Sequence, residues 1–141
     1  MLRAASLVLG AMAVCWVLPM LLIYGNYHLG AMAAQQVAVA ERLRTMGIEP
    51  GDHVALIGDG FDEAYWARLE KVRIVAEVPH NLETGDSATA FWNSGLEGEQ
   101  TVLNVLKSTG AKAVIAAAPP RVLPSGWIQI GNTEHAVYFF R

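Results

Sequence analysis

The sequence contains a single cysteine, Cys15, among its 141 residues, and this scarcity excludes two ways of stabilising a small domain. One thiol cannot close an internal disulfide, and it cannot build a cysteine-based zinc site. Acylation of Cys15 as in lipoproteins is disfavoured, because Val14 precedes it where a small residue is expected, and Trp16 follows it. We therefore interpret Cys15 as a membrane-buried structural residue.

Charged residues are missing from a long stretch near the N-terminus. Residues 4–40 contain no Asp, Glu, Lys or Arg. The first 21 of them, residues 4–24, would form a helix about 30 Å long, which matches the hydrocarbon core of a bilayer. Tyr24 and Tyr27 follow where interfacial aromatic residues are common. We therefore predict a transmembrane anchor over residues 1–27 and a soluble domain over residues 28–141.

Two alternatives for the hydrophobic stretch remain open. A cleaved signal peptide would share the short basic start and could be cut near residues 31–33, but its apolar region is normally about 7–15 residues long. A buried core helix is less favoured, because the remainder of the chain is too small to surround it. Arg3 favours a cytoplasmic N-terminus. We therefore predict a cytoplasmic N-terminus and a domain on the extracytoplasmic side of the membrane. Ser6 and Gly10 could contact other transmembrane helices, although such small-residue pairs are common by chance.

An excess of basic residues is also missing. After residue 27 the chain carries nine Lys and Arg residues against thirteen Asp and Glu residues, a net charge of −4. Nucleic-acid binders normally concentrate basic side chains in a patch, so no nucleic-acid partner is expected. The same balance argues against adhesion of the domain to anionic lipid. We predict a mildly acidic globular domain.

Helix and strand signals alternate along that domain. Helices are predicted at residues 31–46, 62–71 and 97–109. Strands are predicted at residues 53–57, 72–78 and 113–117. Gly47 has the position of a glycine cap at the end of the first helix, and Asp62 that of a cap at the start of the second. Residues 80–95 are expected to form a loop that packs Phe91 and Trp92 inward, and residues 126–130 and 135–140 an antiparallel hairpin.

This order of elements predicts an α/β fold. Strands that alternate with helices imply right-handed crossovers and a largely parallel sheet. The strand at residues 113–117 is uncharged and small, which is typical of a strand covered on both faces. We therefore predict a transmembrane helix followed by a small three-layer, Rossmann-like domain, with a mostly parallel sheet and a C-terminal antiparallel hairpin.

Polar residues follow the predicted strands at the edge where α/β sheets bind ligands. The candidate crevice residues are Asp59, Asp62, His80 and Arg121. Asp59 and His80 could share an acid–base site. Nucleotide binding is disfavoured, because the dinucleotide fingerprint requires a third glycine where Glu63 stands. A carboxylate there would also repel a pyrophosphate at the helix N-terminus.

Other signatures of chemistry are absent from the sequence. It has neither the Gly-Lys-Ser/Thr of a phosphate-binding loop nor the Gly-x-Ser-x-Gly of a nucleophile elbow. The histidines show no pair at metal-ligand spacing, and those that begin predicted strands, His53 and His135, are expected on the solvent side or in turns. We predict no metal and no cofactor. Three tryptophans could stack on a sugar ring but more often form core: Trp66, Trp92 and Trp127.

Several segments together resemble one class of membrane protein. They are residues 41–58, 65–69, 73–77, 91–92, 110–114 and 126–131. The chain resembles the last helix and C-terminal extracytoplasmic domain of bacterial polytopic proteins that are similar to dolichyl-phosphate-mannose protein mannosyltransferases. In that class of glycosyltransferases the catalytic acidic residue lies in an early extracytoplasmic loop, and this sequence contains no such region. The resemblance therefore assigns no catalytic residue here.

These observations favour a membrane-anchored accessory or binding domain that is non-catalytic by itself. The resemblance implies a bacterial inner-membrane protein with a periplasmic domain. It links this domain to a glycosyltransferase-like membrane protein and to envelope glycan or lipid-linked sugar metabolism. One alternative is a structural protein–protein interaction domain. The other is a small membrane-bound enzyme that uses Asp59 and His80.

Overall fold

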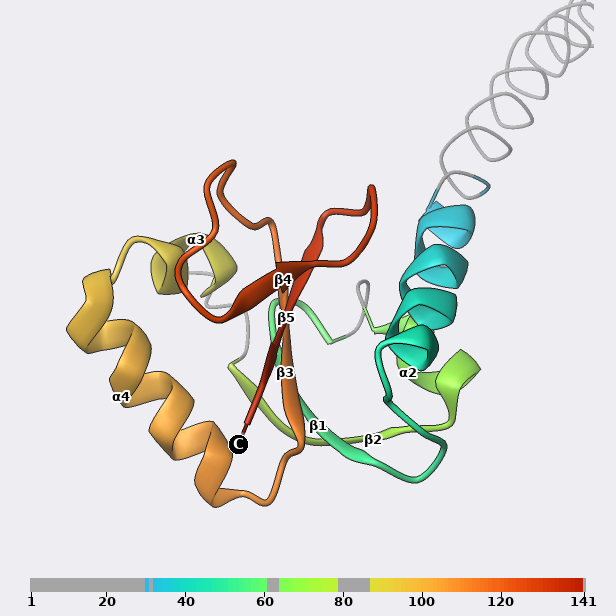
Figure 1. The fold of residues 1–141 in the computed structure, drawn as a ribbon, viewed down its shortest axis with the longest axis horizontal. Coiled ribbons are helices and arrows are strands. Elements are labelled where there is room, and N and C mark those ends of the chain that lie inside the picture. The colour runs from blue at the N-terminus through green and yellow to red at the C-terminus, as the bar shows by residue number, and fades with distance from the viewer. Residues whose placement is uncertain (1–29, 31, 61–63, 79–86, 141) are drawn as a thin grey trace, which may run out of the picture. The chain divides into compact units, whose positions relative to one another are not determined.

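The computed structural model describes residues 30, 32–60, 64–78 and 87–140. The chain separates into two compact units, Met1–Gln35 and Gln36–Arg141. All the strands lie in the second unit (Figure 1). Its architecture determines where functional groups can gather.

The second unit begins with the later part of a helix. Residues 32–45 are helical, in agreement with the prediction. Val39, Ala40 and Leu43 are spaced to share one helix face, and all three are buried. The helix ends at Gly47, whose φ of +94° suits a residue without a side chain. Ile48 then folds back, and its N–H donates to the carbonyl of Leu43 at 3.1 Å. The predicted glycine cap is confirmed.

Five strands form one sheet in the order β2-β1-β3-β5-β4 (Figure 1). The strands are β1 (His53–Ile57), β2 (Arg73–Val78), β3 (Ala113–Ala117), β4 (Trp127–Gln129) and β5 (His135–Phe139). β1 is parallel to both β2 and β3. β5 is antiparallel to both β3 and β4. The predicted hairpin is confirmed, and its second strand pairs with the central strand β3.

The predicted mostly parallel sheet is wrong, because the sheet is mixed: two strand pairs are parallel and two are antiparallel. The physical reason lies in the connection after β3. Pro119 and Pro120 follow that strand directly, and no helix is present before β4. A parallel neighbour requires a long crossover, whereas a tight hairpin can only add antiparallel pairs.

The predicted transmembrane architecture is also contradicted. Within the described parts of the chain, no helix combines the length and apolar character needed to cross a bilayer. The first described helix is amphipathic instead: it buries Val39, Ala40 and Leu43 and exposes Glu41, Arg42 and Arg44. Residues 4–24, which were expected to form the span, lie outside the described residues. The described residues therefore do not contain the predicted single-pass helix.

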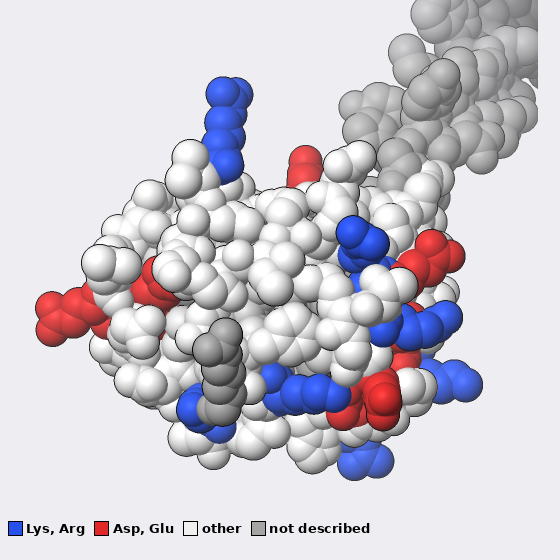
Figure 2. All heavy atoms as spheres, in the orientation of Figure 1, with Lys and Arg blue, Asp and Glu red and all other residues white. Residues whose placement is uncertain are grey.

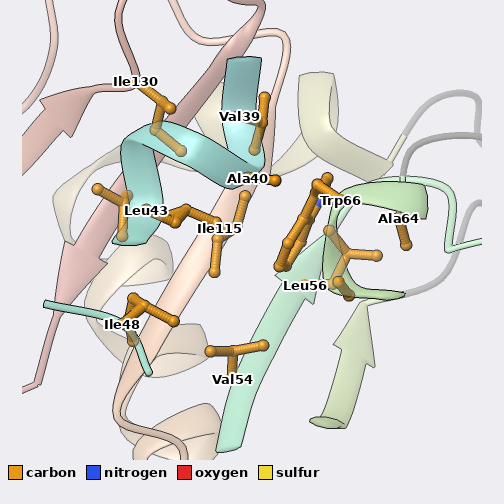
Figure 3. Close-up of a cluster of buried hydrophobic side chains, with 13 residues drawn as sticks. Val39, Ala40, Leu43, Ile48, Val54, Leu56, Ala64, Trp66, Ile115 and Ile130 are labelled. Carbon is orange, nitrogen blue, oxygen red and sulfur yellow. The ribbon is translucent and has the colours of Figure 1, made fainter. Parts of the chain in front are cut away.

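Helices cover both faces of the sheet. On one face the first helix and α2 (Tyr65–Glu70) pack against the strands (Figure 3). This first core contains Val39, Ala40, Leu43, Ile48, Val54, Leu56, Ala64, Trp66, Ala67, Ala113, Ile115, Ile130 and Val137. On the other face α3 (Ser87–Trp92) and α4 (Gly95–Ser108) form a second core with the alternate strand residues, such as Ala55 and Ile57 of β1. The predicted three layers are therefore present.

Two helices differ from their predicted extents. α2 begins only at Tyr65, and its cap residue Ala64 makes no side-chain capping bond. The predicted cap, Asp62, lies outside the described residues. α3 occupies part of the segment that was predicted as a loop over residues 80–95. Phe91 on α3 is nevertheless buried, as predicted.

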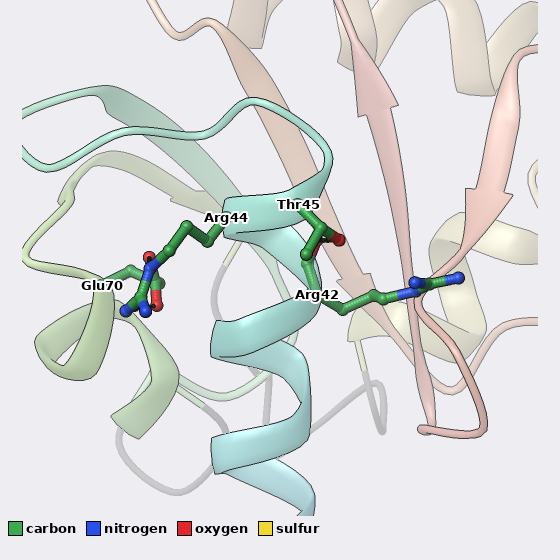
Figure 4. Close-up of polar contacts among 4 residues, drawn as sticks. All are labelled: Arg42, Arg44, Thr45 and Glu70. Atoms are coloured by element: carbon green, nitrogen blue, oxygen red, sulfur yellow. Dashed lines mark hydrogen bonds and ion pairs between the residues drawn. The ribbon is translucent and has the colours of Figure 1, made fainter.

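The first helix stabilises both ends of α2 through polar side chains. Gln36 Oε1 accepts the backbone N–H of Trp66 at 3.0 Å, which replaces the missing side-chain cap. At the other end, Arg44 donates two hydrogen bonds to the carboxylate of Glu70, at 2.7 and 3.2 Å (Figure 4). The Glu70 side chain is fully buried, while 64% of the Arg44 side chain remains exposed. The buried carboxylate thus depends on one cation at the surface.

Replacing Arg44 should therefore destabilise the protein. In Arg44→Met the Glu70 carboxylate stays buried without its cation, and we expect a loss of about 2 kcal/mol in the free energy of unfolding. Arg42→Met is the matched control, because Arg42 lies on the same helix and points away from Glu70 (Figure 4). Chemical denaturation should show a loss below about 0.5 kcal/mol for the control. Equal losses in the two variants would contradict the assigned role of Arg44.

A second ion pair joins Asp52, directly before β1, to Lys112, directly before β3. Lys112 Nζ donates to Asp52 Oδ2 at 2.7 Å and to the carbonyl of Gly47 at 2.9 Å. The N–H of Glu49 donates to the same Asp52 oxygen at 2.8 Å. The hydrogen bond from Lys112, followed by that from Glu49, holds the pKa of Asp52 below its ordinary value. The charged carboxylate therefore stabilises the folded state.

The stability lost in Asp52→Asn should depend on pH. Because the folded pKa of Asp52 is depressed, its contribution is complete above the ordinary carboxyl pKa and disappears as the pH falls through the folded pKa. We expect a loss of about 1 kcal/mol at pH 7 that shrinks towards zero as the pH falls through the folded pKa of Asp52. Urea unfolding at successive pH values measures it, with the exposed Glu49→Gln as control. A pH-independent difference would refute this assignment.

Candidate functional site

The residues of the predicted crevice are only partly described. Asp59 follows β1 and is partly buried, and Arg121 lies exposed in the loop after β3. Because β1 and β3 are parallel neighbours, both residues lie towards the carboxyl edge of the sheet. Asp62 and His80 lie outside the described residues. A proton-transfer site made by Asp59 and His80 therefore stays a prediction.

The hollow beside Arg121 has a volume of about 430 Å³. It is lined by residues 118–121 and by Gln129, Thr133 and Glu134 of the hairpin. The side-chain amide of Gln129 donates to the carbonyls of Thr133 and His135, and the Thr133 hydroxyl donates to the carbonyl of Ile130. These polar groups stabilise the turn between β4 and β5. We therefore assign the hollow a structural role.

Glu77, which the sequence analysis did not single out, ties β2 to the loop after β1. The N–H of Gly60 donates to Glu77 Oε1 at 2.9 Å. A Cβ atom on residue 60 would lie 2.5 Å from the other carboxylate oxygen, so a side chain there would displace the Glu77 carboxylate. The negative charge beside this loop would repel a phosphate group. This contact agrees with the expectation that the edge does not bind a nucleotide.

A larger groove lies between α4 and the C-terminal hairpin. Its volume is about 700 Å³. One wall is a face of α4, where Gln100, Leu103, Asn104 and Lys107 follow the spacing of neighbours on a helix. The opposite side is formed by Ser125, Gly126, Ile128 and residues 138–140. Figure 2 views the molecule from the side on which α4, β4 and β5 lie, and the centre of that surface is largely uncharged.

The aromatic side of the groove rests on a buried network of rings. The ring centroids of Trp92 and Trp127 lie 4.8 Å apart, those of Trp127 and Tyr138 5.5 Å apart, and those of Tyr138 and Phe140 5.7 Å apart. Trp127 is buried, whereas Tyr138 and Phe140 at the groove are half-buried. Tyr138 and Phe140 thus offer ring surface that neighbouring rings hold in place.

Two indole groups of this network are anchored by hydrogen bonds. Trp127 Nε1 donates to Glu99 Oε1 at 2.7 Å, and both residues are buried. Trp92 Nε1 donates to the carbonyl of Ala117, at the end of β3, at 2.8 Å. The expectation that the large tryptophans form core is confirmed for Trp66 and Trp127. The buried indoles of Trp66 and Trp127 cannot serve as the platform for a sugar ring. Trp92 is half-buried but does not line the groove, whereas Tyr138 and Phe140 do.

Several of these roles differ from the sequence-based expectations. Glu99 is buried in α4, while Val105 on the same helix is exposed, although an amphipathic helix normally buries its apolar residues. His135 was expected in a turn or on the solvent side, and this is wrong because its side chain is buried. Gln100 and Asn104 were not predicted as site residues. Their spacing of four residues does indicate that the two amides lie on the same face of a helix. The partial exposure of the aromatic residues of β5 could not be predicted from the sequence, because it depends on which elements cover the strand.

The groove suits binding better than acid–base chemistry. The amides of Gln100 and Asn104 can each donate and accept hydrogen bonds, and the Tyr138 hydroxyl can do both. None of the described residues that line it is a carboxylate or a histidine. Over residues 30, 32–60, 64–78 and 87–140, no group of three His, Cys, Asp or Glu side chains could hold a metal ion.

Comparison with known proteins adds no relative: no protein-family model, no curated protein and no solved structure matches the chain. The resemblance to the C-terminal region of mannosyltransferase-like proteins therefore stays a prediction. The same holds for the extracytoplasmic location and for the expected partners.

Gly126 should be important for the shape of the groove. Its φ is +92°, and a Cβ atom there would lie 2.7 Å from the Tyr138 ring. Gly131 is a matched control, with a φ of +57° and no atom within 4 Å of such a Cβ. Both alanine variants carry the left-handed backbone cost of about 1–2 kcal/mol.

Only Gly126→Ala adds the contact with Tyr138. We expect it to be less stable than Gly131→Ala by about 1 kcal/mol or more. It should also shift the ring resonances of Tyr138 in NMR spectra, which Gly131→Ala should leave in place. Equal stability and unchanged resonances in both variants would contradict the packing of Tyr138 against Gly126.

Proposed function

We propose that residues 36–140 form a non-catalytic accessory domain that binds a carbohydrate in the groove between α4 and β5. The observation that carries this proposal is the groove itself, about 700 Å³ in volume and lined by amide and aromatic side chains. Its size lies within the range typical of small-molecule sites. The domain would serve a larger glycosyltransferase-like protein, in keeping with the resemblance of its sequence.

The chemistry of the lining supports a sugar as the ligand. A pyranose ring presents hydroxyl groups around its rim and apolar C–H groups on its face. Gln100 and Asn104 lie on one face of α4 and can hydrogen-bond the hydroxyls as donors and acceptors. The half-buried rings of Tyr138 and Phe140 offer apolar surface for the C–H face.

The same lining supports a binding role over a catalytic one. Hydrolysis or transfer of a glycosyl group normally uses a pair of carboxyl groups on either side of the bond. Glu99 is the carboxylate of α4 nearest in sequence to Gln100, but it is buried and accepts the indole N–H of Trp127. Glu99 has a structural role instead: it holds the indole of Trp127, and the ring of Trp127 packs against Tyr138.

The competing hypothesis of a protein-interaction domain has weaker support. It requires a contiguous apolar surface on the hairpin. Val122 and Ile128 are exposed, but the exposed residues beside them in sequence, Arg121 and Gln129, are polar. Scattered apolar residues of this kind are normal on a protein surface.

A glycan array probed with the full chain tests the proposal, followed by titration of the best glycan. We expect Asn104→Ala to weaken binding about fivefold, because the variant removes one hydrogen-bonding amide from the groove. Asn93→Ala is the matched control: Asn93 is an exposed amide that does not line the groove. Binding of no glycan, or equal weakening by the two variants, would overturn the proposal.

A further inference from the structure

We propose that the ligand of this groove is an N-acetylated amino sugar, whose acetamido group is bound between α4 and the rings of Tyr138 and Phe140. This inference rests on the proposed function and narrows the class of carbohydrate. Two features of the groove carry it: the pair of carboxamides on α4, and the different orientations of the two rings. Each feature matches a different part of an acetamido group.

The carboxamides of Gln100 and Asn104 match the polar part. Both residues are exposed and line the groove, and the Cβ atoms of residues four apart on a helix are about 6 Å apart. A secondary amide presents one N–H donor and one carbonyl acceptor on opposite sides of its planar C–N bond. Because each carboxamide can donate and accept, the pair can bind both groups of one acetamide at the same time. A hydroxyl group in its place needs only one of them.

The rings of Tyr138 and Phe140 match the apolar part. Their centroids lie 5.7 Å apart, and their planes make an angle of 67°. A pyranose can lie with its C–H face on one of these rings, but the other ring then faces in a different direction. The second ring therefore remains open to another apolar group of the ligand. The methyl of an acetamido group supplies it, directly beside the amide that α4 would bind.

The lining disfavours the free amino sugar. None of the described residues that line the groove is a carboxylate, so an ammonium group would find no anionic partner there. Glu99 on the same helix is buried and accepts the indole N–H of Trp127. Acetylation removes the positive charge and adds the carbonyl and the methyl that the groove can contact.

The experiment probes the full chain with sets of matched glycans that carry an acetamido, a hydroxyl or an amino group at the same carbon, followed by titration of the best set. We expect the acetamido member to bind about fivefold more tightly than its hydroxyl match, because it gains a further hydrogen bond. The amino member should bind no better than the hydroxyl member.

Variants then locate the preference. Gln100→Ala and Asn104→Ala should each reduce the acetamido member towards the affinity of its hydroxyl match, since each removes one partner of the ligand amide. Asn93→Ala is the control, because Asn93 is exposed and does not line the groove, and it should keep the full preference. Chemical denaturation of each variant separates a loss of binding from a loss of folding.

Three results are distinguishable. The expected preference, reduced by both groove variants and kept by the control, supports the inference. If acetamido and hydroxyl members bind equally, if the amino member binds best, or if both groove variants keep the preference, the inference is overturned while a carbohydrate site survives. If no glycan binds, both the inference and the proposed function fail.

Discussion

The central strand β3 constrains the rest of the domain. All five of its residues, Ala113–Ala117, are buried, and it pairs with β1 on one side and with β5 on the other. A strand without exposed residues has to be covered on both faces, because each exposed apolar face would cost free energy in water. The first helix and α2 cover one face, and α3 and α4 cover the other. The three layers follow from this requirement.

The way the chain leaves β3 then creates the groove. Two prolines end the strand, and the chain returns as a hairpin that places β5 antiparallel to β3. β5 thereby extends the sheet, and its last residues come to lie across from one face of α4. The strand β4 is shorter and pairs only with Ala136, Val137 and Tyr138. Phe139 and Phe140 therefore reach beyond the hairpin ladder and remain half-buried.

Much of the local structure could be predicted from the sequence. The helix ending at Gly47, the strand Ala113–Ala117 and the hairpin were correct, because each depends on short-range patterns such as a glycine cap or an uncharged run. The prediction of a mostly parallel sheet was wrong, because the alternation of strands and helices stops after β3. The pairing of β5 with β3 joins segments that are distant in the sequence, so local patterns do not determine it. The candidate site could not be predicted from the sequence, because residues about 30 positions apart, such as Glu99 and Trp127, meet only after folding.

The same geometry supports the proposal that a ligand binds at the groove and not at the carboxyl edge of the sheet. At that edge, the N–H of Gly60 donates a hydrogen bond to the Glu77 carboxylate. This carboxylate occupies the space that a side chain on residue 60 or an anionic ligand would need. At the groove, the buried groups are satisfied beneath the surface: Glu99 with Trp127, and Trp92 with Ala117. The rings at the groove are held in place by these contacts and by one another. A site whose supporting hydrogen bonds are already formed loses less entropy on binding, so a modest set of contacts can hold a polar ligand.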